Sequence, residues 1–262
     1  MIVTGVDIGS LTGKAVIMEN ESILSYSIIP RVPLCEKTAT DAMNQALKKA
    51  GLSLDDIEYV MGTGYGRLNI PFAKENVTEI SCHGKGAYWL NPATRTVIDI
   101  GGQDCKVIRI NEKGKVIDFV MNDKCAAGTG RFLEVMAKAL EVKLEDLGPL
   151  SLQSTNPVTI SSQCSVFAES EVISLLAERE SIINIIAGLH ESISSRLVAL
   201  VHKVGLQREV VLSGGVAKNI GVTRCLNNKL GVELITLPAD PQIIGAIGAA
   251  LFAKTKLQTS KT

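Results

Sequence analysis

Aromatic residues make up only 4% of this 262-residue sequence, which contains a single tryptophan. Because proteins that bind single-stranded nucleic acid stack the bases on aromatic side chains, this scarcity argues against such a partner. The charges agree, since 27 basic residues balance 27 acidic ones. A formal net charge of zero gives no sign of a polyelectrolyte partner, so we expect no nucleic-acid binding.

Long apolar runs are also missing. The longest, residues 243–253, is too short to cross a bilayer and is interrupted by Gly245 and Gly248. The first apolar strand begins at Ile2, so we expect no signal peptide. These features predict a cytoplasmic protein that does not bind membranes.

The six cysteines lack the spacing of a single-chain metal site, because no CxxC or CxxxC occurs. Cys125 and Cys164 each precede a helical pattern, and a helix N-terminus favours a negatively charged thiolate. These two thiols therefore have two interpretations, metal binding and simple burial. An all-cysteine cluster needs four ligands, and a twofold dimer would supply the missing two. We expect the remaining cysteines to be core or surface thiols: Cys35, Cys82, Cys105 and Cys225.

One pattern occurs twice in the sequence. Residues 1–17 read MIVTGVDIGSLTGKAVI, and residues 95–110 read RTVIDIGGQDCKVIRI. Each copy contains an apolar strand, Asp-Ile-Gly, a small polar turn, a lysine and another apolar strand. Two hairpins of one design indicate a duplicated α/β fold with halves at 1–94 and 95–262. The C-terminal helical pattern, 242–253, is free to cross back to the first half.

Both turns carry groups that suit a phosphate. Glycine lets backbone N–H groups approach an anion closely, as in phosphate-binding loops. Asp7 and Asp99 end their strands, where carboxylates commonly hold a magnesium ion through water. We expect the two turns to grip a nucleotide from both sides. The expected phosphate ligands are Gly9, Ser10, Leu11, Thr12 and Lys14 in the first copy and Gly101, Gly102, Gln103 and Lys106 in the second.

Three more glycine turns follow strands or precede helices. Residues 210–219, VVLSGGVAKN, predict a close backbone approach at Gly214 and Gly215, with Lys218 and Asn219 placed to meet a sugar or a base. The GTGYGR motif at 62–67 fits either a nucleotide or partner contact or an ordinary turn. A short strand is expected at 77–80. A contact with phosphate or ribose is expected ahead of the helix at 131–140, from Gly128, Thr129 and Gly130.

Taken in order, these motifs resemble those of a known superfamily. DIGSLTGK, IDIGGQDCK and VLSGGVAKN are similar to the two phosphate motifs and the adenosine motif of acetate and sugar kinases, heat-shock chaperone ATPases and actin. The runs at 124–132, 164–171 and 241–250 resemble signatures of the activators of 2-hydroxyacyl-CoA dehydratases. These activators belong to the BadF/BadG/BcrA/BcrD ATPase family, which includes the ATPase subunits of benzoyl-CoA reductase. The resemblance extends nearly from end to end.

The resemblance implies an actin-like, ribonuclease H-like ATPase fold with two halves around a nucleotide cleft. It implies a homodimer with one 4Fe-4S cluster, held by Cys125 and Cys164 of each chain, together with ATP or ADP and Mg²⁺. Asp7 and Asp99 would lie near the metal, and Gln103 would orient the attacking water. The adenosine end would be held by Gly214, Gly215, Lys218 and Gln242.

The implied activity is ATP-driven, low-potential transfer of single electrons to a dehydratase or a related iron–sulfur reductase. Ferredoxin or flavodoxin would supply the electrons, and the exposed cluster would be oxygen-sensitive, as suits an anaerobic enzyme. Two alternatives stay open. A small-molecule kinase of the same fold would use a carboxylate such as Asp104 as its base. A nucleotide-dependent assembly or regulatory protein would need no iron.

Overall fold

The computed structural model describes residues 1–122, 125–162 and 164–259. The chain folds into two compact units. The first comprises Met1–Val97, Ile108–Asp118 and the chain from Leu237 onward, and the second comprises Ile98–Val107 and Phe119–Thr236. These units are defined by contacts within the folded chain. The expected halves, 1–94 and 95–262, were inferred from the sequence repeat, and they stay a prediction. Lys124 and Gln163, which belong to the two cysteine motifs, lie outside the described residues.

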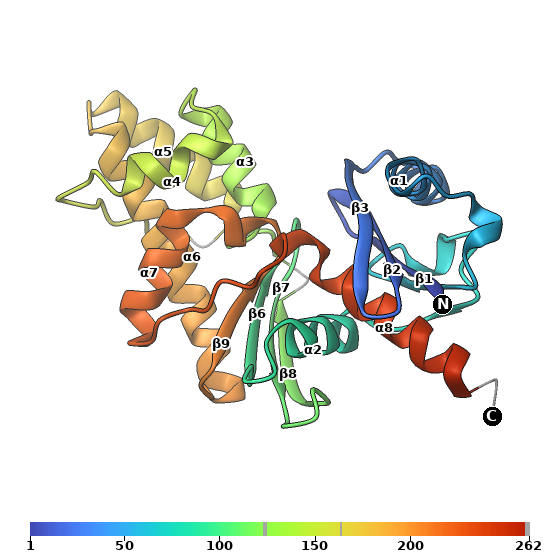
Figure 1. The fold of residues 1–262 in the computed structure, drawn as a ribbon. Helices are drawn as coiled ribbons and strands as arrows, with labels where there is room; N and C mark the ends of the chain where they lie inside the picture. Colours follow the sequence, from blue (N-terminus) through green and yellow to red (C-terminus); the bar gives the residue numbers. More distant parts are fainter. Residues whose placement is uncertain (123–124, 163, 260–262) are drawn as a thin grey trace. The chain divides into compact units, whose positions relative to one another are not determined.

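A five-stranded sheet with the strand order β3-β2-β1-β4-β5 forms the centre of the first unit, and Figure 1 labels three of its strands, β1, β2 and β3. β1 pairs antiparallel with β2 and parallel with β4, and the register sets Asp7 opposite Lys14. Both central strands are almost fully buried, which agrees with their apolar sequences. The strands are β1 (Ile2–Ile8), β2 (Thr12–Glu19), β3 (Ser22–Pro30), β4 (Tyr59–Thr63) and β5 (Glu75–Asn76).

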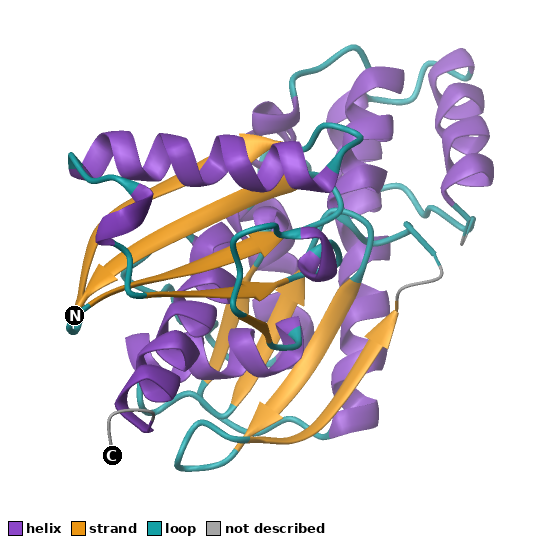
Figure 2. Cartoon of the chain, turned by 90° about the vertical axis from the view of Figure 1, so that its right-hand side faces the viewer, coloured by secondary structure: helices purple, strands orange, loops and turns teal. Residues whose placement is uncertain are grey.

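Helices cover both faces of this sheet. α1 (Cys35–Ala50) packs its alanines against Val6 and Ile8, and it lies along the strands in Figure 2. Successive side chains of a strand point to opposite faces, so Gly5 and Asp7 face the other side, where α8 (Ile244–Thr259) packs. α2 (Glu79–Leu90) lies against α8. Asp7 therefore lies on the sheet face that α8 covers.

The second sheet repeats the strand order of the first. Its order is β8-β7-β6-β9, and a parallel bridge from Val211 to Ile235 adds a fifth position beside β9. The two orders correspond strand for strand, which confirms the predicted duplicated α/β fold. The strands are β6 (Thr96–Ile100), β7 (Cys105–Ile110), β8 (Val116–Asn122) and β9 (Val210–Ser213).

Helices and a large apolar core complete the second unit. Phe132 and Met136 of α3 pack with Leu189, Ile193 and other residues of α6 in one buried cluster. The helices are α3 (Gly130–Ala139), α4 (Leu147–Ser151), α5 (Ser165–Ala177), α6 (Ile182–Val204) and α7 (Ile220–Leu230). Short 3₁₀ turns occupy Leu54–Asp56, Arg67–Asn69, Leu144–Asp146, Gly215–Lys218 and Pro241–Ile243.

Two local expectations differ from the structure. The strand expected at 77–80 is wrong, because Thr78 caps α2 by accepting a hydrogen bond from the Ser81 backbone N–H. The C-terminal helix continues beyond the expected residue 253 to Thr259. In the described part of the chain, none of the helices combines the length and hydrophobicity of a membrane span.

Candidate functional site

The first copy of the repeat buries an ion pair. Lys14 Nζ lies 3.2 Å from Asp7 Oδ2, and the residues are only 8% and 5% exposed. They meet because the antiparallel register of β1 and β2 places them opposite each other. Each charged group of this pair lies beside its opposite, which offsets part of the cost of removing both from water.

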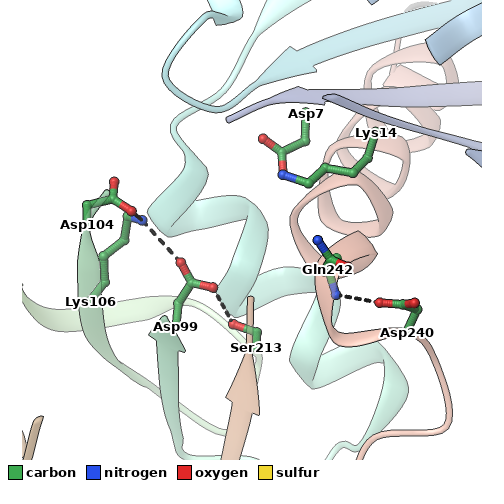
Figure 3. Close-up of polar contacts among 8 residues, drawn as sticks. All are labelled: Asp7, Lys14, Asp99, Asp104, Lys106, Ser213, Asp240 and Gln242. Atoms are coloured by element: carbon green, nitrogen blue, oxygen red, sulfur yellow. Dashed lines mark hydrogen bonds and ion pairs between the residues drawn. The ribbon is translucent and has the colours of Figure 1, made fainter. Parts of the chain in front are cut away.

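The second copy repeats this ion pair and extends it. Lys106 Nζ lies 3.1 Å from Asp99 Oδ2, and Ser213 Oγ donates a 2.8 Å hydrogen bond to Asp99 Oδ1 (Figure 3). Lys106 also lies 3.0 Å from Asp104 Oδ1. Asp99, Lys106 and Ser213 come from the neighbouring strands β6, β7 and β9. Both oxygens of the buried Asp99 carboxylate are therefore held in place.

The two expected phosphate turns have the same backbone geometry. The Gly9 N–H donates to Thr12 O at 3.0 Å, and the Gly101 N–H donates to Asp104 O at 2.9 Å. These two N–H groups close their own turns, so phosphate contacts would come from other groups of the turns. Arg31 supports the first turn, since its backbone N–H donates to Leu11 O at 2.9 Å.

A glycine with positive φ lies close to each buried aspartate. Gly64 (φ 87°) follows β4, and Gly214 (φ 85°) follows β9. A Cβ at Gly64 would collide with Asp7 Oδ1, and a Cβ at Gly214 would lie 2.9 Å from Asp99 Oδ1. Only glycine lets the neighbouring strand approach these carboxylates so closely. The 62–67 motif is thus the first-copy counterpart of the glycine turn after β9.

The second phosphate turn is bonded directly to the start of α3. The Gly130 N–H donates to Gly101 O at 2.9 Å, and the Arg131 N–H donates to Gly102 O at 2.8 Å. These are two of the N–H groups that a helix N-terminus leaves without a partner in the helix. The turn therefore caps α3, which begins five residues after Cys125.

Cys125 and Cys164 border the same cavity. The cavity has a volume of about 360 Å³. Cys164 is exposed and is the N-cap of α5, while Cys125 is half-buried. The described residues contain no group of three or more histidine, cysteine or carboxylate side chains placed to hold a metal ion. The lining residues are Cys105, Asn122, Cys125, Ala127, Gly128, Cys164, Arg196, Leu197 and Leu200.

Cys105 is a third thiol on this cavity, but its chemistry differs. Burial raises its pKa to about 11, and the nearby charge of Asp104 adds to the effect. The thiol is therefore protonated at neutral pH, whereas metal ligation needs a thiolate. Asn122 joins this region to the Cys125 loop, because its Nδ2 donates to Cys125 O at 3.3 Å.

The loop before Cys164 is fixed by Glu171 of α5. Oε1 of Glu171 accepts from the Ser161 backbone N–H at 2.8 Å, and Oε2 accepts from the Ser162 N–H at 2.9 Å. Partial burial acts to raise the pKa of Glu171, but the hydrogen bonds from Ser162 and Ser161 outweigh it and lower the pKa to about 2. Glu171 thus stays ionised and keeps this loop in place.

The residues of the expected adenosine motif divide into two groups. Gly215 and Lys218 are exposed on the 3₁₀ turn after β9. Asn219 does not serve as an exposed contact, because its Oδ1 caps α7 and its Nδ2 lies 3.2 Å from His190 Nε2. Gln242 belongs to the first unit, where its backbone N–H donates to Asp240 Oδ1 at 2.9 Å (Figure 3).

The other expected site residues vary in exposure. Gln103 is exposed, and Ser10, Leu11 and Thr12 are half-buried. Thr129 is buried, and its hydroxyl hydrogen bonds inside its own loop, to Ala126 O. Contributors that the sequence patterns did not reveal are Ser213, Glu171 and Arg196. Ser213 belongs to the predicted adenosine motif at 210–219, which could have suggested it. No local sequence signal marks Glu171 or Arg196.

The chain resembles known proteins along nearly its whole length. Residues 4–253 match the sequence profile of the BadF/BadG/BcrA/BcrD ATPase family. The chain is 48% identical over 253 residues to the activator of lactoyl-CoA dehydratase from Anaerotignum propionicum, with 97% of each chain covered. A solved structure, the activator of the 2-hydroxyisocaproyl-CoA dehydratase from Clostridium difficile with bound ADPNP, matches with a TM-score of 0.95 and 46% identity. That match covers 100% of this chain and 97% of the other.

A more distant likeness concerns the fold alone. A ROK family glucokinase from Streptomyces griseus, in complex with glucose and AMPPNP, has a TM-score of 0.55 and 17% identity. The match covers 97% of this chain and 100% of the glucokinase. Together with the repeated sheet order, these likenesses confirm the predicted actin-like ATPase fold.

Proposed function

The chain belongs to the BadF/BadG/BcrA/BcrD ATPase family, and from that premise we propose that it is an ATP-hydrolysing electron donor that activates a 2-hydroxyacyl-CoA dehydratase. The observation that carries this proposal is the placement of Cys125 and Cys164 on one cavity, within the unit that also contains the second phosphate turn. A kinase would need no such arrangement of thiols. The glucokinase likeness supports only the fold, so it gives the kinase alternative no functional support.

Each buried aspartate, taken with its own turn, has groups that suit ATP and Mg²⁺. Mg²⁺ prefers oxygen ligands and usually keeps several waters, which suits Asp7 and Asp99 at their strand ends. Each aspartate is held by a lysine, so a carboxylate oxygen has a fixed direction before nucleotide arrives. Gln103 is exposed on the second turn, where its amide would orient the attacking water. Gly9 and Gly101 would close the two turns around the phosphates. The phosphates would meet Ser10, Leu11, Thr12, Lys14, Gly102 and Lys106, and the adenosine end Gly214, Gly215, Lys218 and Gln242.

A 4Fe-4S cluster fits the thiol pair, provided that two chains share it. When bound, such a cluster accepts and releases single electrons. Cys125 and Cys164 supply two of the four thiolates, and a second copy related by a twofold axis would supply the rest. Val166 and Phe167, which follow Cys164 in the first turn of α5, are 66% and 68% exposed. A second copy would remove these apolar side chains from water, which would stabilise the homodimer.

Nucleotide and thiols are linked through the start of α3. The second phosphate turn accepts two hydrogen bonds from this helix, and Cys125 lies on the preceding loop. A turn that rearranges around the γ-phosphate would therefore move α3 and the Cys125 loop with it. We propose that this movement favours electron release to the partner in the ATP state, and that hydrolysis resets it. Gly128, Thr129 and Gly130 would act in this step as the connecting loop.

The partner would be a 2-hydroxyacyl-CoA dehydratase, or a related iron–sulfur reductase of the benzoyl-CoA type. Ferredoxin or flavodoxin would reduce the cluster in the cytoplasm of an anaerobic cell. Because the cavity opens at an exposed cysteine, oxygen would reach the cluster easily. We therefore propose an oxygen-sensitive homodimer that works as a reductase component.

The test is activation of a purified 2-hydroxyacyl-CoA dehydratase by the reduced, anaerobically prepared protein. We expect dehydratase activity with MgATP, none with ADP, and ADP and inorganic phosphate as the only new products from the nucleotide. A phosphorylated small molecule formed from ATP would support the kinase instead. Failure to activate either a dehydratase or a benzoyl-CoA-type reductase, with ATP hydrolysis intact, would contradict the proposal.

A further inference from the structure

Arg196 of α6 holds the loop that leads to Cys164. Its Nη2 donates a 3.2 Å hydrogen bond to the carbonyl oxygen of Ser162, whose N–H is bound by Glu171. The backbone of Ser162 is therefore held at both ends, by a carboxylate from α5 and a guanidinium from α6. Cys164 follows two residues later in the sequence.

The same arginine borders the loop that carries Cys125. Gly128 has φ 91°, and Arg196 Cδ is the nearest side-chain atom to the space that a Cβ at this position would fill, at 3.8 Å. Arg196 and Gly128 also line the same cavity. One side chain of α6 therefore bonds the loop before Cys164 and lies beside the loop after Cys125.

Arg196 also brings a positive charge to the cavity. It is half-buried and lines the cavity together with both cysteines. Within residues 1–122, 125–162 and 164–259, no carboxylate forms an ion pair with it. Cluster potentials respond to net charge and to hydrogen bonds near the sulfurs. A cation at this position favours the reduced cluster, which carries one more negative charge than the oxidised one.

We propose that Arg196 is a positioning residue for the cluster, which fixes the loop before Cys164 beside the Cys125 loop and raises the reduction potential of the bound cluster. The inference rests on the proposed function, since it assumes that these thiols bind iron and sulfide. It assigns the positioning of a cysteine loop to α6, which lies outside both cysteine motifs. The ATPase reaction does not involve Arg196, so ATP turnover without a partner is expected to continue in its variants.

The test compares Arg196→Met and Arg196→Lys with Lys203→Met, which removes an exposed cation from the end of the same helix. Iron content and the fraction of reduced cluster are measured in anaerobic redox titrations followed by electron paramagnetic resonance. At fixed solution potential, we expect the ratio of reduced to oxidised cluster in Arg196→Met to fall about tenfold, which is a shift of about 59 mV for one electron. Arg196→Lys keeps the charge and should retain the ratio within about twofold, and Lys203→Met should behave as wild type.

Hydrogen exchange of the full-length protein gives a second readout. The amides of Ser161 and Ser162 should exchange faster in Arg196→Met than in Lys203→Met, whether or not iron is present. If Arg196→Met fails to fold, the same measurement is made on Arg196→Lys. Its Ser161 and Ser162 amides should exchange faster than those of wild type, because lysine lacks the planar fork of the guanidinium.

The outcomes separate the two proposals. Wild-type protein without iron would contradict the proposed function, while faster exchange in the variants would still support the role of Arg196 in fixing the loop before Cys164. An iron-loaded Arg196→Met with wild-type potential and wild-type exchange would overturn the inference alone. An equal shift of potential in Lys203→Met would also overturn it, because the effect would then be one of general surface charge.

Discussion

The backbone N–H of Arg131 donates a 2.8 Å hydrogen bond to the carbonyl oxygen of Gly102. Gly102 belongs to the second expected phosphate turn, and Arg131 belongs to the first turn of α3. The bond therefore joins the proposed nucleotide site to the helix that follows Cys125. A neighbouring bond from Gly130 to Gly101 runs in parallel with it.

Replacing Arg131 with proline removes this N–H together with the exposed ion pair to Glu134. Proline is tolerated in the first turn of a helix, and Gly130 accommodates the restriction that proline places on the preceding residue. We expect ATP hydrolysis to continue while the effect of nucleotide on the cluster weakens about fivefold, since one backbone hydrogen bond contributes about 1 kcal/mol. The measurement is the rate at which a ferrous chelator extracts iron with ATP, relative to the rate with ADP.

Arg131→Ala is the matched control, because it removes the exposed ion pair with Glu134 but keeps the backbone N–H. It should preserve the nucleotide effect. If Arg131→Pro also preserves it, α3 does not transmit the nucleotide state through this bond.

Asp99→Asn is expected to lower ATP turnover about 100-fold or more, because removing one preorganised charge from a transition state costs roughly 3 kcal/mol. The variant should still fold, since Lys106 keeps Asp104 as its partner. Steady-state release of phosphate measures the change, and circular dichroism checks the fold.

Asp104→Asn tests the kinase alternative, in which this carboxylate would be the base. Here Lys106 keeps its bond to Asp99, so we expect ATP turnover within about threefold of wild type. A loss as large as that of Asp99→Asn would show that the activator account assigns the wrong carboxylate.

Stability should depend on pH through His190. This histidine is fully buried, and burial lowers its pKa from the ordinary 6.5 to about 4. Between these values the unfolded chain binds more protons than the folded chain, so the free energy of unfolding falls as the pH falls. From pH 7 to pH 5 the loss attributable to His190 is about 2 kcal/mol.

Urea unfolding of wild type and His190→Gln at both pH values isolates this contribution. The variant should lose about 2 kcal/mol less between pH 7 and pH 5 than wild type loses. His202→Gln removes an exposed histidine, and its free energy of unfolding should change with pH as that of wild type does. Equal slopes in wild type and His190→Gln would mean that His190 is not held neutral.

The repeated hairpins, with an aspartate at the end of each first strand, could be predicted because their determinants are local, whereas the burial of these aspartates and their ion pairs with lysine were not predicted. Asp-Ile-Gly followed by lysine specifies a strand, a turn and a returning strand, and the antiparallel register then brings Asp7 to Lys14. The same reasoning located the helix starts after Cys125 and Cys164. Their meeting at one cavity followed from the family resemblance and not from spacing, since 38 residues separate them.

Contacts across long stretches of sequence could not be predicted. Ser213 reaches Asp99 over 114 positions, and Arg196 reaches Ser162 over 34. No periodicity encodes such distances, which depend on how β9 and α6 pack in the second unit. The strand expected at 77–80 failed for another reason. Its β-branched residues favour a strand, but the Thr78 cap begins α2 at that point.

The most direct test of the central claim is the iron and acid-labile sulfide content of anaerobically purified protein, together with its molecular mass. We expect a dimer with about two irons per chain, lost in Cys125→Ala and in Cys164→Ala. Cys105→Ala removes the third thiol of the same cavity and should retain the iron. Anoxic protein that hydrolyses ATP but contains no iron, or iron that depends on Cys105 instead of Cys125 and Cys164, would contradict the account.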